Sequence, residues 1–169
     1  MTALGLASGI AGSYAYQLEP LWRELSVGAI FGVVIGGYLC FLRLATPLKA
    51  AAFAVLTVLA WWAAERSAIH IFAALPGEAS DFLSLNGLIT GVAAGLEGAL
   101  LLALAGALLF PFYRRLDLGL ATAVTGGVFG ALMTLLDLTD SALVLFAPWQ
   151  AAIAFCLALG LPKDAPTSP

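Results

Sequence analysis

The sequence predicts an all-α fold: a polytopic membrane protein built as a bundle of five to six transmembrane helices with glycine-rich helix faces. The 169 residues are 62% hydrophobic and only 10% charged, and the mean hydropathy is +1.03. A soluble domain is about 25% charged and about 45–50% apolar, so this chain has more apolar residues than a buried core uses. Several apolar runs are also long enough to cross a bilayer core of about 30 Å as helices.

These runs form one predicted transmembrane domain over residues 1–161, followed by a polar, proline-rich tail at 162–169. We expect the tail to be disordered and cytoplasmic. Prolines mark boundaries of the runs. Pro20 suits the first turn of a helix, and Pro47 and Pro111 each interrupt a helix. The predicted spans lie at residues 2–18, 26–44, 48–64, 86–109, 118–138 and 142–161.

Two of the spans have a second interpretation. Residues 2–18 are weakly apolar, and they form either a short sixth span or a helix in the membrane interface. They lack the basic region of a cleaved signal peptide. The span at 48–64 extends to about residue 75 if Pro76 is the first residue to stop the helix, and its end then stands above the membrane.

Charge predicts the orientation of the spans. The positive-inside rule assigns the lysine- and arginine-rich loops to the cytoplasm, and the C-terminus with them. The N-terminus then lies outside with five spans, or inside with six. The composition is typical of a bacterial protein, so we expect the bacterial cytoplasmic (inner) membrane. The cations that set this orientation are Arg43, Lys49, Arg114, Arg115 and Lys163.

The other side of the membrane carries an expected ion pair. Counted outward from the turn at Thr46, Arg23 and Glu24 lie about as far along one helix as Glu65 and Arg66 lie along the next. The sequence therefore predicts that Arg23 pairs with Glu65 across this hairpin.

A single carboxylate, Glu97, interrupts the apolar run at 86–109. A charged group at this depth costs about 2.5–3.5 kcal/mol even on the lenient insertion scale, so it should face the bundle interior. Asn86 and Thr90 share its helical face. Two interpretations stay open: a proton, cation or substrate-amine site, or a structural carboxyl group hydrogen-bonded to a neighbouring helix.

Gln150 is the second polar group expected near the middle of a span. It forms either an interhelical hydrogen bond or a shared site with Glu97. Tyr38 and Thr57 fall at comparable depth and would complete a polar cluster with it. Pro148 lies two residues before Gln150 and frees a backbone carbonyl for other partners.

Glycines repeat every four residues on several of the predicted helices, which is typical of closely packed membrane helices. These faces are expected to build either the monomer or a contact with a second copy or another membrane subunit, within the lipid bilayer. The glycines are Gly28, Gly32, Gly36, Gly87, Gly91, Gly95, Gly126 and Gly130.

The sequence favours two functions. The first is a small transporter, channel or membrane-embedded transporter subunit that uses an intramembrane carboxylate. The alternative is a scaffold, assembly or regulatory subunit of a membrane complex. We expect no metal site, no cofactor and no nucleic-acid partner, because the chain carries neither ligand spacing nor basic runs for them. No triad-like set or phosphate loop points to an enzyme.

Overall fold

The computed structural model describes residues 1–17, 20–75, 83–139 and 141–162, except for the side chains of residues 20–24 and 137. Within these residues the chain is helical and has no strand, so the predicted all-α fold is confirmed. The longer helices are α1 (Thr2–Ala15), α2 (Pro20–Phe41), α3 (Pro47–Ala74), α4 (Leu85–Leu109), α5 (Leu116–Gly130) and α7 (Leu143–Leu159). The short ones are η1 (Pro111–Tyr113), η2 (Ala131–Leu135) and α6 (Leu136–Thr139).

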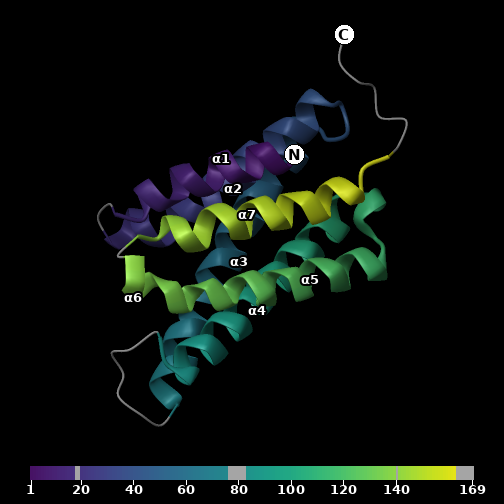
Figure 1. Ribbon diagram of the computed structural model, residues 1–169. Coiled ribbons are helices and arrows are strands. Elements are labelled where there is room, and N and C mark those ends of the chain that lie inside the picture. The colour runs from purple at the N-terminus through teal and green to yellow at the C-terminus, as the bar shows by residue number, and fades with distance from the viewer. Residues whose placement is uncertain (18–19, 76–82, 140, 163–169) are drawn as a thin grey trace.

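The longer helices form a closed ring in chain order (Figure 1). Each helix packs against the next, and α7 packs against both α5 and α1, which closes the ring. We call one end of this ring the N/C end, because Met1, the turn at 42–46, the connection at 110–115 and Gly160 lie there. The opposite end, where α1 and α3 finish and α4 and α7 begin, is the far end.

Local chemistry explains where two of the helices begin. Thr46 caps α3, since its hydroxyl accepts the Lys49 N–H at 3.3 Å and Pro47 follows as the first helical residue. Ser84 caps α4 in the same way and accepts the Gly87 N–H at 3.2 Å. Side-chain oxygens at this position satisfy backbone donors that have no partner within the helix.

Glycines set how closely two helix pairs approach. A Cβ atom added at Gly28 would lie 2.7 Å from the Thr57 carbonyl oxygen on α3, and one at Gly36 would lie 3.0 Å from the Ala50 carbonyl oxygen. A Cβ atom at Gly95 on α4 would collide with the carbonyl oxygen of Gly126 on α5. The absence of side chains therefore lets these backbones touch.

Most of the predicted packing glycines contact another helix of the same chain. Gly28, Gly32 and Gly36 face α3, while α4 and α5 meet through the remaining glycines except Gly87. Gly87 is buried near the start of α4.

The interior of the ring is filled at the N/C end. Phe53 of α3 and Phe110 at the end of α4 are fully buried there, with ring centroids 5.7 Å apart. Ile35 and Ile153 belong to the same apolar cluster. This half of the ring is a packed core.

The outside of the ring is apolar as well. Exposed large apolar residues recur every four positions along α4, and α5 carries a similar row. Three stretches are long and apolar enough to cross a membrane: Pro47–Ala74, Leu85–Leu109 and Leu116–Leu135. Leu25–Phe41 and Leu143–Leu159 are shorter apolar helices.

The helix bounds differ from the predicted spans in several places. Helix α2 begins at Pro20, before the apolar run at 26–44, and α3 continues through Ala74, as the longer interpretation of its span expects. After Gly130 the chain tightens from α5 into the 3₁₀ segment η2, so the stretch at 118–138 is not one uniform helix. The N-terminal residues form the 14-residue helix α1.

Candidate functional site

A cavity of about 140 Å³ lies inside the far-end half of the ring. The late part of α3 and the early parts of α2, α4 and α7 line it, together with Tyr16 at the end of α1 and Met133 of η2. Phe31 and Leu102 belong both to its lining and to the packed core. The core is therefore the floor of the cavity.

Aromatic rings form the walls between α3 and α7. Phe146 of α7 packs edge-to-face against Trp61 of α3, with centroids 5.1 Å apart and planes at 85°. Tyr16 meets the same Phe146 ring at 5.1 Å and 77°. Edge-to-face geometry suits the ring quadrupoles and fixes their orientation.

Trp149 supplies a further wall and is held by the backbone of α5. Its indole N–H donates to the Gly126 carbonyl oxygen at 3.1 Å. Gly126 also lets α4 and α5 touch. The same glycine thus serves helix packing and the position of an indole in the cavity.

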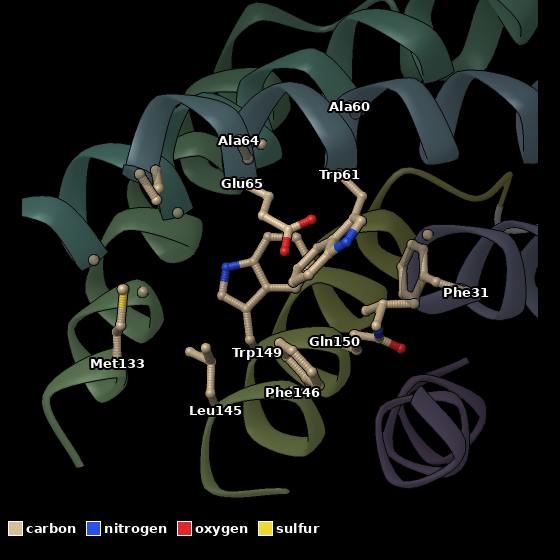
Figure 2. A pocket seen from close by; sticks show the side chains of 18 of the residues that line it. Phe31, Ala60, Trp61, Ala64, Glu65, Met133, Leu145, Phe146, Trp149 and Gln150 are labelled. Carbon is tan, nitrogen blue, oxygen red and sulfur yellow. The ribbon is translucent and has the colours of Figure 1, made fainter. Parts of the chain in front are cut away.

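Glu65 brings the charge to the cavity. It lies one helical turn after Trp61 on α3, so the two side chains share a face of that helix. Figure 2 shows its carboxylate directed toward the Trp61 and Trp149 indoles. Glu65 is the charged residue of the lining within the part of the chain that the structure describes.

Gln150 and Thr57 complete the polar part of the lining. The Ser8 hydroxyl of α1 donates to Gln150 Oε1 at 2.6 Å, and both residues are buried. The Thr57 hydroxyl donates to the Ala54 carbonyl oxygen at 2.7 Å and lies 3.0 Å from that of Gly28. Gln150 thus makes an interhelical hydrogen bond, to a helix that the sequence did not indicate.

The structure brings together only part of the predicted polar cluster. Gln150 and Thr57 line the cavity, whereas the other predicted site residues are absent from the lining. Glu97 is half-buried, and no hydrogen bond or ion pair is recorded for it among the described residues. Thr90 is completely buried, and Asn86 and Tyr38 are half-buried.

Some predictions fall on residues that are not described. The side chains of Arg23 and Glu24 lie outside the described part of the chain, and so does the tail beyond residue 162. The expected pairing of Arg23 with Glu65 stays a prediction.

The sequence did not assign four prominent lining residues to the candidate site: Glu65, Trp61, Trp149 and Phe146. The tryptophan pair at 61–62 resembles a membrane-interface belt, and Glu65 is followed by Arg66, which is typical of a solvated helix end. The available signal was the spacing of four between Trp61 and Glu65, which puts an indole and a carboxylate on one helix face.

The N/C end carries exposed charge. Arg115 pairs with Asp117 at 2.6 Å, and both side chains are more than half exposed. The Arg114 Nε–H donates to the Ala107 carbonyl oxygen at 3.0 Å. Beneath them, burial raises the pKa of the Tyr113 phenol. Within the described residues, no group of three His, Cys, Asp or Glu side chains is arranged to hold a metal ion.

Comparison with protein-family models, with curated proteins and with solved structures finds no match to this chain. The cavity and the arrangement of the ring are therefore the features that point to a function.

Proposed function

We propose that this chain is an integral membrane protein whose helix ring holds a small ligand, and that it serves transport as a carrier or as the ligand-binding subunit of a transporter. The observation that carries the proposal is the aromatic cavity of about 140 Å³ with a carboxylate in its wall. Cavities that are mostly apolar, with a few polar groups directed inward, are where proteins bind small molecules.

The surface of the ring supports a membrane location. Large apolar side chains are exposed on each of the six longer helices, and soluble monomers rarely expose apolar patches of that extent. Lipid would cover this surface and leave the helix backbones satisfied by their own hydrogen bonds. The bacterial cytoplasmic membrane is the proposed location.

Charge and fold both support one proposed orientation. Arg43, Arg114 and Arg115 are exposed at the N/C end, and Lys49 lies there in the first turn of α3. With this end in the cytoplasm, both termini are cytoplasmic and α1 is a short sixth span. The cavity then lies in the outer half of the bilayer.

The packed core argues for a binding protein or carrier rather than an open channel. A channel needs a water-filled path, whereas Phe53, Phe110 and Ile153 fill the ring below the cavity and are fully buried. A ligand that enters from the outside would stop at this floor until the helices rearrange. The chemistry expected here is binding without bond making or breaking.

The scaffold alternative relied on glycine faces free to dock other helices. The glycines that touch another helix do so between neighbouring helices of the ring, among them the pairs α1–α7, α2–α3 and α4–α5. Gly37 and Gly119 have open space around them, but isolated small residues are weak docking features. The cavity therefore favours the ligand-binding proposal.

Filling the cavity tests the proposal. The protein in lipid nanodiscs is titrated with benzyl alcohol and with benzylammonium while tryptophan emission is recorded, because Trp61 and Trp149 line the cavity. We expect at least one probe to bind saturably, and Ala68→Leu to weaken that binding at least tenfold because its side chain enters the cavity.

Ala73→Leu is the matched control, since Ala73 lies on the same helix, is exposed and does not line the cavity. It should bind like the unchanged protein. Equal binding by both variants, or no saturable binding of either probe to the unchanged protein, would rule out the proposed cavity function. Recovery of the protein from the soluble fraction after expression would rule out the membrane location.

A further inference from the structure

The charge and the rings of the cavity together select a class of ligand. Among the described lining residues Glu65 carries a formal charge, and it is negative; the neighbouring surface consists of the indoles of Trp61 and Trp149 and the ring of Phe146. Aromatic faces attract cations through their quadrupole, most strongly when water is excluded, and tryptophan is the best of them. A carboxylate beside such faces therefore favours a cation over a neutral or anionic ligand.

A bare metal ion fits this lining poorly. Hard cations need about six or more oxygen ligands at short range. A single carboxylate, that of Glu65, supplies too few oxygens for such a shell, and the neighbouring polar groups add little: Gln150 Oε1 accepts the Ser8 hydroxyl, and the Thr57 hydroxyl donates to the backbone. The apolar lining instead suits the hydrocarbon part of an organic cation.

The size of the cavity limits that cation. An apolar cavity of about 150 Å³ in another protein holds a benzene ring, and the cavity here measures about 140 Å³. A single six-membered ring or a compact branched alkyl group fits this volume together with one ammonium group.

The position of Glu65 on α3 makes such a charge accessible. Glu65 lies 18 residues beyond Pro47, or about 27 Å along the helix axis at 1.5 Å per residue. In the proposed orientation this is close to the outer edge of a hydrocarbon core of about 30 Å. A cation arriving from water would reach the carboxylate without crossing the bilayer centre.

We infer that the cavity is a binding site for a small organic ammonium ion, with its ammonium group against Glu65 and its apolar body among Trp61, Trp149 and Phe146. This inference rests on the proposed ligand-binding function and adds the ligand class to it. The ammonium group forms a charge-assisted hydrogen bond with the carboxylate, and the neighbouring indoles contribute cation–π attraction.

The test compares two probes of nearly equal size, benzylammonium and benzyl alcohol, by calorimetry on the protein in nanodiscs with empty nanodiscs as blanks. We expect benzylammonium to bind at least tenfold more tightly. Glu65→Gln should bring the two affinities to within about twofold of each other and retain benzyl alcohol binding. Asp117→Asn, which neutralises an exposed carboxylate at the other end of the ring, should keep the preference.

If Glu65→Gln does not fold, the affinities of the unchanged protein for the two probes still test the ammonium site. Equal affinity for the two probes overturns the ammonium site and leaves the ligand-binding function standing. If neither probe binds, both proposals fail. Because the sequence predicts Arg23 as a neighbour of Glu65, the titration is repeated with Arg23→Gln: equal or tighter benzylammonium binding supports the ammonium site, and loss of binding overturns it.

Discussion

The surroundings of two carboxyl groups on long helices differ. Glu65 shares its helix face with Trp61 and lines the cavity. Glu97 is half-buried near the middle of α4 and lies outside that lining. The cost of a mid-membrane carboxylate marks Glu97 in the sequence, but the groups that would recognise a ligand gather around Glu65.

Glu97→Gln separates the two positions. We expect the affinity for benzylammonium to stay within about twofold of the unchanged protein, because Glu97 does not line the cavity. The measurement is the same calorimetric titration. If Glu97→Gln lowered this affinity tenfold or more, the ligand would bind at Glu97 on α4, as one interpretation of the apolar run at 86–109 predicts.

The sequence alone indicates only some of the residues that line the cavity. Gln150 and Thr57 stand out because each is polar within an apolar run, and both line the cavity. Glu65 does not stand out, because it is followed by Arg66, Ser67 and, a turn later, His70. Distance along a helix does not reveal which face the neighbouring helices cover, so Glu65 could not be told from a solvated charge.

The backbones of α4 and α5 touch at positions where only glycine fits. Cβ atoms added at Gly91 and Gly95 would overlap the carbonyl oxygens of Gly130 and Gly126 on α5. In lipid such packing replaces the hydrophobic effect as the source of helix association. The packing of α4 against α5 therefore depends on having glycine at these positions.

Gly95→Leu tests this dependence. The new side chain meets backbone atoms that cannot move without separating the helices, so we expect a loss of at least 1–3 kcal/mol, roughly the cost of overpacking, seen as a lower thermal unfolding midpoint in detergent. Gly119→Leu is the control on α5, since nothing lies within 4 Å of a Cβ atom there. Similar midpoints for the two variants would contradict the contact.

The sequence predicts helices and neighbouring pairs better than it predicts the ring. Pro20 and Pro47 mark helix starts because proline fits the first turn, and glycines spaced by four mark the faces that meet. Gly5 and Gly9 of α1 are also spaced by four and face α7, but a face of small residues does not identify the helix that it contacts. The hydrogen bond between Ser8 and Gln150, 142 residues apart, becomes visible only in the structure.

The whole molecule has two unlike halves, a packed core at the N/C end and a cavity at the far end. In the proposed orientation, water-soluble molecules reach the cavity from outside and meet the core as a barrier. We therefore expect the cavity to be accessible to water-soluble molecules from the outside and not from the cytoplasmic side.

Single cysteines report this asymmetry after Cys40 and Cys156 are replaced by alanine. We expect Ala68→Cys, in the cavity lining, to react with a membrane-impermeant maleimide added outside intact cells. Leu157→Cys, at a position only 1% exposed in the core, should stay unlabelled from either side. Labelling of Ala68→Cys only from the cytoplasmic side of inverted vesicles would reverse the orientation.

The closure of the ring by α1 and α7 also has a consequence for synthesis. Helix α1 leaves the ribosome long before α7, on which it packs, because Ser8 and Gln150 are 142 residues apart. Until then Gly5 and Gly9 of α1 lack the α7 backbone that they touch in the finished protein. The cavity, which needs both Tyr16 and Phe146, therefore cannot exist on a nascent chain. A ligand can therefore bind only after α7 has been made and has packed against α1.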